Sequence, residues 1–323
     1  MKAWVRILGL TAVVGFGTAC EPLDWDGDGG GGSGGGGAFS SGFVFVRGDT
    51  ASGRDVYVVD DDGDPNLPVR LTTQGGASAP TVARSGLLVA YVYRSGSTWE
   101  LRTVPTTGQG TPSTVVSSQS CAPCNNFQAP VFSPSGSEIA FTLTRNGVSS
   151  VARVNTDGSG FQLLLQGTYN VHGAASYYPD GQRLLVTAGT SANQMTTLRV
   201  VNLSTGVANT LTSSLGNAGA FTVVSRAVVS PDGTRVAFDA QTSNGAQIFV
   251  GQLGQGLSGV TQLTRHTGES GVVDSWPSWR GNTEVTFQSS AGGSDNLYRV
   301  STASPGAGTL VVPRVLEPAY GGR

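Results

Sequence analysis

Lysine is almost absent from this sequence, because Lys2 is the only lysine among its 323 residues. Charged residues of all kinds make up only 12 % of the chain, and it contains two histidines and three cysteines. Without Lys2 and Arg6 the 19 basic residues become 17, against 21 acidic residues, which leaves a net charge of −4. Such a chain offers no lysine amine for Schiff-base chemistry. It also has no cluster of basic residues, which argues against binding to nucleic acid.

Long hydrophobic runs are missing as well. The most apolar segment, residues 7–16, has only about ten residues, which is too short for a helix that spans a bilayer. This segment follows the basic residues Lys2 and Arg6 and precedes small residues at positions 17–19. That order predicts a signal peptide over residues 1–19, which exports the chain from the cytoplasm of a bacterium.

Cys20 stands directly after the predicted signal peptide. Small residues that end in a cysteine resemble a lipobox, the site at which a lipoprotein is cleaved and lipidated. The resemblance implies lipid attachment at Cys20 and anchoring in the cell envelope, since each buried methylene of an acyl chain contributes about 0.8 kcal/mol. An ordinary signal peptide followed by a chance cysteine is the alternative. Glu21 rather than aspartate comes next, which favours the outer membrane, on the side of the periplasm or of the cell surface.

A glycine-rich stretch separates Cys20 from the remainder of the chain. Runs of glycine and serine behave as flexible coils that hold a folded body away from its anchor. The sequence therefore predicts a lipid-anchored linker over residues 20–41 and one folded domain over residues 42–323.

The folded part contains an internal repeat. The whole sequence has 48 glycines, and in the folded part short apolar strands recur with aromatic or aliphatic final residues that are 45 to 52 residues apart. These six final residues are Phe45, Tyr91, Phe141, Val186, Phe238 and Phe287. Each repeat also has room for three further strands separated by turns rich in Gly, Asn and Asp. Repeats of this length are typical of propeller blades, so the sequence predicts an all-β, six-bladed β-propeller of four-stranded antiparallel blades.

Within the repeats, Val58-Val59-Asp60, Arg70-Leu71-Thr72 and Ser230-Pro231-Asp232-Gly233 are similar to the repeat of TolB-like propellers. The resemblance extends over roughly residues 42–323. It implies protein–protein interaction, as in the envelope-integrity system to which TolB belongs. TolB proteins carry an α/β domain before the propeller, whereas the linker occupies that place here. The resemblance thus indicates a lipoprotein with a TolB-type propeller that lacks the TolB N-terminal domain.

The first repeat lacks an inner strand, because Phe43 follows the glycine-rich stretch at once. The C-terminal segment Pro318-Ala319-Tyr320-Gly321 has the same proline–aromatic pattern as Pro277-Ser278-Trp279. We therefore predict that the C-terminal segment supplies the missing strand and closes the ring, since a closed ring leaves no open sheet edge between its first and last blades.

Few residues are suited to bind metals or cofactors. Cys121 and Cys124 are predicted to form a disulfide in an oxidising compartment, with metal binding and redox activity as alternatives. The acidic run Asp60–Asp64 could hold calcium, although a solvated turn is the favoured interpretation. No metal and no cofactor is expected.

Four polar residues are candidates for a binding rim: His172, Arg226, His266 and Asp274. Each lies close to the start of a repeat, and connections between blades emerge on one face of a propeller. Rigid scaffolds often carry function on such loops. The alternative is that they are scattered polar residues without a shared role.

The function favoured by these observations is a non-catalytic envelope lipoprotein, a monomer, whose propeller serves as a protein-binding scaffold. A polysaccharide-binding module and a propeller-based polysaccharide lyase are the alternatives. A metal-dependent lyase would need a cluster of histidine and acidic ligands, and two histidines make such a cluster sparse. We therefore do not expect an enzyme.

Overall fold

The computed structural model describes residues 39–166, 171–191, 195–212 and 223–322 of the chain. The predicted signal peptide, Cys20 and all but the last residues of the predicted linker lie outside the described residues. Phe39 is buried at 5 % exposure and packs in the core, so the folded domain includes residues that were assigned to the linker. In the described part of the chain no helix is long and apolar enough to cross a membrane.

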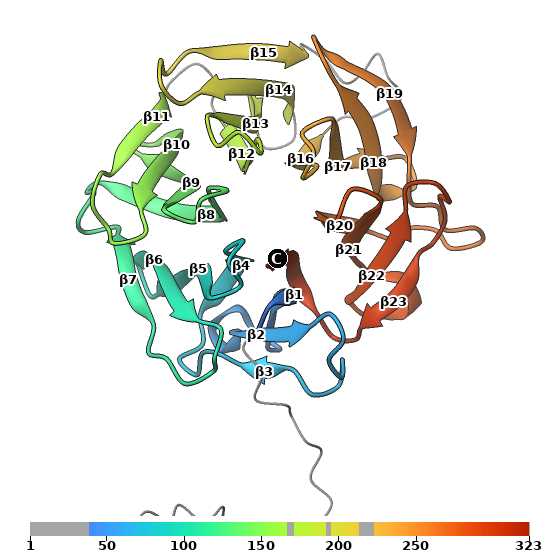
Figure 1. Cartoon of the computed structure of the whole chain (residues 1–323), viewed down its shortest axis with the longest axis horizontal. Helices are drawn as coiled ribbons and strands as arrows, with labels where there is room; N and C mark the ends of the chain where they lie inside the picture. Colours follow the sequence, from blue (N-terminus) through green and yellow to red (C-terminus); the bar gives the residue numbers. More distant parts are fainter. Residues whose placement is uncertain (1–38, 167–170, 192–194, 213–222, 323) are drawn as a thin grey trace, which may run out of the picture. The chain divides into compact units, whose positions relative to one another are not determined.

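Six four-stranded antiparallel sheets form a closed ring of blades (Figure 1). Blade 1 contains, from the centre outward, β24 (Leu316–Gly322), β1 (Ser41–Arg47), β2 (Asp55–Asp60) and β3 (Val69–Arg70). Blade 2 contains β4 (Ala77–Val82), β5 (Leu88–Ser95), β6 (Thr98–Pro105) and β7 (Ser113–Ser117). Blade 3 contains β8 (Cys124–Phe132), β9 (Glu138–Arg145), β10 (Val148–Asn155) and β11 (Gln162–Gln166).

The other three blades repeat this order. Blade 4 contains β12 (Val171–Tyr177), β13 (Arg183–Gly189), β14 (Met195–Asn202) and β15 (Ala208–Thr212). Blade 5 contains β16 (Val224–Val229), β17 (Arg235–Thr242), β18 (Gly245–Leu253) and β19 (Leu257–Gln262). Blade 6 contains β20 (Asp274–Arg280), β21 (Glu284–Ser289), β22 (Asn296–Ser301) and β23 (Thr309–Val312). Two single-turn 3₁₀ helices, η1 (Ala51–Gly53) and η4 (Ala291–Gly293), lie in connections.

The second strand of each blade is buried on both faces, because each blade is packed between two others. The side chains of Phe45, Phe141, Phe238 and Phe287 in these strands are 0 % exposed. This burial explains why the second strands are nearly continuous apolar runs rather than alternating ones. The core lies between neighbouring blades: Leu101 of blade 2, for example, belongs to the same buried cluster as Phe141 of blade 3.

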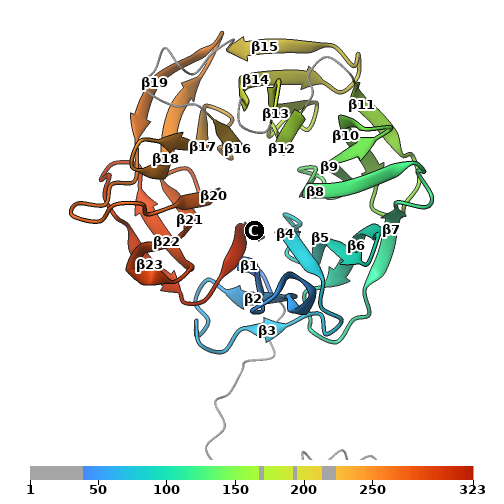
Figure 2. The same cartoon turned by 180° about the vertical axis from the view of Figure 1, so that it is seen from behind.

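The C-terminal strand closes the ring, as the sequence predicted. β24 pairs antiparallel with β1, and Phe43 lies opposite Tyr320 with the two rings 5.2 Å apart. Blade 1 is therefore built from both ends of the folded domain, which removes the open edge that β1 would otherwise present. Figure 2 shows the same closed ring from behind.

The Ser-Pro-Asp-Gly segments form the turns between inner and second strands. In blade 5, Asp232 Oδ1 accepts hydrogen bonds from Ser230 Oγ at 2.6 Å and from the Thr234 amide at 2.9 Å. Gly233 has a φ of 75°, a conformation that residues with a side chain rarely adopt. We call the edge of the ring that carries these turns, such as residues 230–235, the turn edge. The opposite edge, which carries connections between blades such as residues 263–273, is the loop edge.

Every inner strand (β24, β4, β8, β12, β16 and β20) contains a β-bulge, where its register against the second strand shifts. A bulge bends the strand and redirects side chains. We call the residue before the Pro or Ala in each of these bulges the bulge position. Around the ring it is occupied by Ala79, Ala129, Ala174, Arg226, Trp276 and Glu317.

Candidate binding channel

The inner strands of all six blades enclose a central cavity of about 560 Å³. Its lining extends from the bulge positions to the turn edge, for example from Arg226 to Pro231 in blade 5. Prolines contribute much of the wall, namely Pro80, Pro130, Pro134, Pro179, Pro231, Pro277 and Pro318. Because proline has no amide hydrogen and a fixed φ, this wall is rigid and poor in backbone donors.

Aromatic side chains also form the wall of the cavity. Trp279 donates a hydrogen bond from Nε1 to the carbonyl of Val228 at 2.9 Å, which ties β20 to β16. Tyr320 accepts the hydroxyl hydrogen of Ser278 at its carbonyl and donates its amide hydrogen to the same hydroxyl oxygen at 3.0 Å. Tyr177 lines the cavity as well, and its hydroxyl is buried without a hydrogen-bond partner among the described residues.

Arg226 occupies the bulge position of β16. Its guanidinium carbon lies 3.3 Å from the ring centroid of Trp276, which occupies the same position of β20. This distance is typical of a cation–π stack. The side chain of Arg226 is 27 % exposed, and a nitrogen of its guanidinium lies 4.0 Å from the carboxylate of Asp239. Burial lowers the pKa of Arg226 from its ordinary value, against the attraction of Asp239 and Glu317, which raises it.

Asp239 of β17 holds the backbone of two bulges. Its Oδ1 accepts hydrogen bonds from the amides of Arg226 at 2.7 Å and Ser225 at 3.2 Å, and its Oδ2 accepts one from the amide of Trp276 at 3.4 Å. The carboxylate is 4 % exposed. Burial raises the pKa of Asp239, although the attraction of Arg226 and the amide hydrogen bonds lower it in part. Through its amide hydrogen bonds Asp239 holds the backbone of Arg226 and Trp276 in position.

Glu317 plays a similar role at the bulge position of β24. Its Oε2 accepts a hydrogen bond from the amide of Ala79 at 2.5 Å, and its Oε1 pairs with Arg54 at 3.1 Å. Its own amide donates to Gln288 Oε1 at 2.7 Å. Glu317 thus links blade 1 to blade 2, while Gln288 links blade 6 to blade 1.

The charges that line the cavity are of one sign. Arg226 lies at the inner end and Arg84 at the turn edge, and the lining contains no Asp or Glu. Arg84 is exposed. Basic residues without acidic ones in the lining favour anions over cations there, although Asp239 and Glu317 lie behind the lining close enough to act on Arg226.

The comparisons with known proteins agree with this fold. No family model and no curated protein matches the sequence. Among solved structures, TolB from Acinetobacter baumannii matches with a TM-score of 0.66 at 19 % identity, over 88 % of this chain and 67 % of that one. A putative TolB from Agrobacterium tumefaciens matches with a TM-score of 0.57 at 16 % identity, over 85 % of this chain and 88 % of that one. The chain folds into a TolB-like propeller.

The TolB-like propeller is also similar to a protein in a crystal structure of a nidogen/laminin complex. The TM-score is 0.63 at 9 % identity, and the match covers 87 % of this chain and 98 % of that one. At these identities the likeness concerns the fold.

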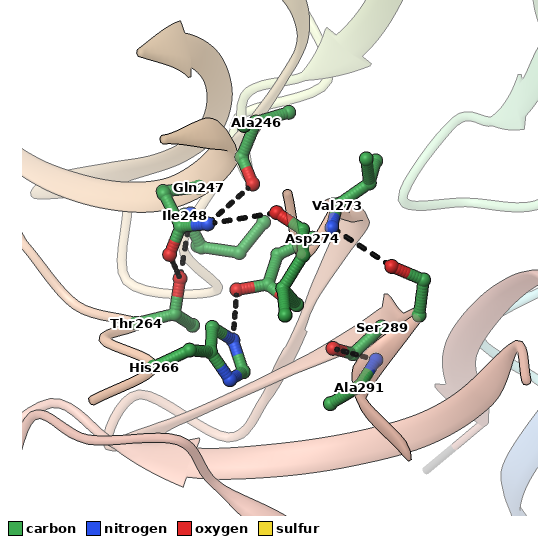
Figure 3. Close-up of polar contacts among 12 residues, drawn as sticks. Ala246, Gln247, Ile248, Thr264, His266, Val273, Asp274, Ser289 and Ala291 are labelled. Atoms are coloured by element: carbon green, nitrogen blue, oxygen red, sulfur yellow. Dashed lines mark hydrogen bonds and ion pairs between the residues drawn. The ribbon is translucent and has the colours of Figure 1, made fainter. Parts of the chain in front are cut away.

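The residues predicted to form a rim do not form one group in this TolB-like propeller. His266 and Asp274 lie near the loop edge between blades 5 and 6, and His266 Nε2 is 2.8 Å from Asp274 Oδ2 (Figure 3). Their side chains are 4 % and 0 % exposed, so the pair faces the interior of the blade junction rather than solvent. Arg226 lies in the channel. His172 is part of β12, and its side chain lies outside the description.

A hydrogen-bond network surrounds the His266–Asp274 pair. Gln247 Nε2 donates to the carbonyl of Val272 at 3.1 Å, and Thr264 Oγ1 accepts from the amide of Ile248 at 3.0 Å. These bonds attach the connection between blades 5 and 6 to β18, as Figure 3 shows. The His266–Asp274 pair therefore helps to hold the connection between blades 5 and 6 against the neighbouring strands.

Cys121 and Cys124 are joined by a disulfide, with their Cα atoms 5.6 Å apart. Both side chains are buried, and the carbonyl of the intervening Pro123 accepts a hydrogen bond from Asn146 at 3.3 Å. The disulfide therefore lies at the loop edge, where the connection before blade 3 contacts the hairpin of that blade. Oxidation of the pair in the cell stays a prediction.

The acidic run Asp60–Asp64 takes part in contacts within the protein. Asp61 pairs with Arg280 of β20 at 2.7 Å, and Asp64 accepts a hydrogen bond from the amide of Asn66 at 2.8 Å. Within the described residues, no three His, Cys, Asp or Glu side chains are grouped so that they could hold a metal ion.

Sequence reasoning missed Trp276 and Glu317 as residues that shape the channel. Neither residue is among the candidates that the sequence singles out above. An alignment of the repeats at the Pro or Ala of each inner strand contains the signal. The preceding residue is Ala in three repeats and Arg, Trp or Glu in the other three.

Proposed function

We propose that this chain is a non-catalytic, lipid-anchored protein of the bacterial cell envelope whose TolB-like propeller binds a protein partner. The observation that carries the proposal is the central cavity of about 560 Å³, which all six inner strands line and which reaches the turn edge. Ligand pockets commonly have volumes of about 300–1,000 Å³. The cavity can therefore accept several side chains of an inserted segment of the partner.

The character of the wall supports a peptide as the occupant. Prolines and aromatic residues such as Trp279 and Tyr320 offer rigid apolar contacts, and a few polar groups converge between them. Rigid walls reduce the entropy that is lost on binding. The structural neighbour from a nidogen/laminin complex supports the idea that propellers of this fold bind proteins.

The anchor is the second part of the proposal. Cys20 would carry the lipid, and the glycine-rich residues up to Phe39 would give the propeller reach within the envelope. Replacing Cys20 by Ser should move the protein from the membrane fraction to the soluble fraction and abolish labelling with a radioactive fatty acid. A chain that stays lipid-labelled after this change would contradict the assignment of Cys20.

The binding role can be tested by site-specific photo-crosslinking in cells. A benzophenone amino acid at Pro231, an exposed residue of the cavity mouth, should crosslink to one distinct protein. The matched control is the same amino acid at Leu310, an exposed residue of the outer strand β23 with 50 % exposure. Crosslinks of equal pattern at both positions, or none at Pro231, would contradict binding at the channel.

Trp279 and Tyr320 in the wall also favour a second candidate, a polysaccharide-binding function, because sugars stack on aromatic rings. Retention of the purified chain on immobilised envelope polysaccharide, lost on replacing Trp279 by Leu, would support this alternative. Cleavage of the polysaccharide that stops after chelation of metals would instead indicate a lyase.

A further inference from the structure

The guanidinium of Arg226 lies at the inner end of the cavity without a hydrogen-bond partner among the described residues. Within the described part of the chain its guanidinium donates no hydrogen bond, and its Nε is fully buried without a partner. Arg54 also has a buried Nε without a partner, but another nitrogen of its guanidinium pairs with Glu317 at 3.1 Å, and Arg47 donates to the carbonyl of Pro313 at 2.9 Å. A guanidinium has five N–H donors, and leaving buried donors unpaired is unfavourable. Because the side chain of Arg226 is 27 % exposed and lines the cavity, a ligand there can accept hydrogen bonds from its guanidinium.

Asp239 does not accept a hydrogen bond from the guanidinium of Arg226. The distance of 4.0 Å between their charged atoms exceeds that of a hydrogen bond. Both oxygens of Asp239 face backbone amides instead, those of Ser225 and Arg226 at Oδ1 and that of Trp276 at Oδ2. The aspartate thus supplies a nearby negative charge that keeps the guanidinium in place, and it leaves the donors of Arg226 free for another acceptor.

Trp276 prepares the guanidinium for a planar partner. The guanidinium carbon lies 3.3 Å from the centre of the indole ring, so the ring covers one face of the cation. All N–H donors of a guanidinium lie at the edge of its plane, where they can bind a carboxylate with two parallel hydrogen bonds. A stack of this kind fixes the plane before the ligand arrives, which reduces the entropy that binding costs.

The charged residues that line the cavity also favour a ligand with a carboxylate. Arg226 at its inner end and Arg84 at its mouth are the charged residues of the lining, and no acidic residue accompanies them there. Complementary charge favours an acidic partner and disfavours a basic one.

From these observations we propose that the channel binds an extended, acidic segment of a partner protein, and that Arg226 binds the carboxylate of an Asp or Glu side chain in that segment. The inference rests on the proposed function, because it names the chemistry of the partner at the same channel. Arg84 attracts the segment at the turn edge, and Arg226 and Trp276 hold the acidic side chain at the inner end.

The test begins with short random peptides displayed on phage and selected on the purified full chain. Selected sequences should be enriched in Asp or Glu, and a synthetic peptide should crosslink to the benzophenone amino acid at Pro231. Titration calorimetry then compares this peptide with a version in which its acidic residues are amides. We expect the amide version to bind at least about tenfold more weakly, as for loss of a charge-assisted pair.

Substitutions in the chain test whether Arg226 is responsible for the preference for acidic peptides. Arg226→Met should lower the affinity for the acidic peptide by about tenfold or more and the affinity for the amide version by less than about twofold. Arg226→Lys should restore only part of the binding, because lysine lacks the planar fork. The matched control is Arg94→Met, since Arg94 also stacks on a tryptophan, Trp99, at 4.7 Å but lies outside the channel. This control should leave both affinities unchanged.

Folding of the variants is checked by thermal unfolding. Because Arg226→Met removes the stack on Trp276 and leaves the buried charge of Asp239 without its neighbouring cation, the Tm should fall, and affinities are compared at a temperature at which the variant is folded. If Arg226→Met does not fold, Arg226→Gln serves for the same comparison.

The outcomes separate the two proposals. Peptides that crosslink at Pro231 but bind equally well as acids and amides would overturn the carboxylate inference and leave the protein-binding function in place. Binding that requires a free peptide C-terminus, and that C-terminal amidation abolishes, would replace the acidic side chain by a terminal carboxylate and also overturn the inference. Selection of no peptide that reaches Pro231 would contradict both.

Discussion

The inner strands around the channel form two unlike arcs built on the same backbone. In β16, β20 and β24, the polar arc, the bulge position carries Arg226, Trp276 and Glu317; in β4, β8 and β12, the alanine arc, it carries alanine. All six inner strands share the bulge. The comparison shows that the repeat supplies the geometry, and that a single residue in each blade decides whether the bulge position carries a large polar or aromatic side chain or only a methyl group.

The two arcs also differ in how neighbouring inner strands are connected. In and around the polar arc, side-chain hydrogen bonds join β12 to β16 through Ser176, β16 to β20 through Trp279, β20 to β24 through Ser278, and β24 to β4 through Glu317. Among the described residues no such bond joins β4 to β8 or β8 to β12. The alanine arc depends on apolar packing, so polar substitutions should affect the two arcs to different extents.

Removal of the strand that ends the polar arc should have the largest effect. Deleting residues 316–323 removes β24, its pairing with β1 and the contacts of Glu317. We expect a loss of at least about 5 kcal/mol in the free energy of unfolding, because an open sheet edge and an exposed core face remain. Circular dichroism during heating measures the Tm. Deletion of Arg323 alone is the control, and an unchanged Tm after the longer deletion would refute the closure.

Asp239 tests the difference between the arcs directly. Asp239→Ala leaves the part-buried amides of Ser225 and Arg226 without an acceptor and removes a buried charge beside Arg226, which should cost about 2–4 kcal/mol. The matched control is Thr142→Ala, one position after Phe141 in blade 3 as Asp239 is after Phe238 in blade 5. Thr142 makes one long hydrogen bond of 3.4 Å, so its loss should cost less than about 1 kcal/mol. Urea unfolding measures both, and equal losses would mean that the arcs do not differ.

The charge of Asp239 should make the comparison depend on pH. Burial raises the pKa of this carboxyl in the folded protein above the value of about 3.9 that it has in the unfolded chain. The stability that this shift contributes is complete below that value and is lost as the pH rises through the folded pKa.

Asp239→Asn keeps an acceptor and does not titrate, so its stability relative to the parent should increase from about pH 4 towards neutral pH. Urea unfolding at several pH values measures the difference. A difference that stays constant with pH would show that Asp239 titrates alike in the folded and unfolded chains.

Trp279→Phe converts one position of the polar arc to its counterpart in the alanine arc. Phe132 occupies that place in β8, and both side chains are 6 % exposed. The change removes the hydrogen bond from Nε1 to the carbonyl of Val228 and should cost about 1–1.5 kcal/mol. Chemical unfolding provides the measurement. The reverse change, Phe132→Trp, should not stabilise the protein, and a gain would indicate that the arcs are interchangeable at this position.

The smallest effect is expected at the surface where blade 6 meets blade 1. Asp61 pairs with Arg280, and the two side chains are 24 % and 28 % exposed. Asp61→Asn should therefore lower the stability by less than about 1 kcal/mol, and the difference should shrink at high salt. Unfolding with and without added salt measures this dependence. A larger, salt-independent loss would show that this pair contributes to the ring closure as much as the buried contacts do.

The architecture could be predicted from the sequence because its signals are local. The apolar strands that end in Phe45, Phe141, Phe238 and Phe287 are fully buried second strands, and the Ser-Pro-Asp-Gly segments are the turns that their residue types favour. The closing strand was predictable for the same reason, since Pro318 and Tyr320 repeat the pattern of another inner strand.

The site was harder to predict, because it depends on contacts between residues far apart in the chain. Arg226 and Asp274 were expected on a common rim near the loop edge, whereas Arg226 lines a cavity that reaches the turn edge and Asp274 is enclosed with His266. A bulge changes the direction of side chains along a strand, and nothing local in the sequence marks which way Arg226 turns.

The sequence by itself determined the number of blades, the turns and the strand that closes the ring, because hydrophobic periodicity and turn chemistry act over a few residues. Only the tertiary structure decided that Arg226 stacks on Trp276 and that Asp239 serves the amides around both. Arg226 and Trp276 are 50 positions apart in the chain, yet the guanidinium carbon of Arg226 lies 3.3 Å from the ring centroid of Trp276. Only the closing of adjacent blades around one axis brings the two side chains together.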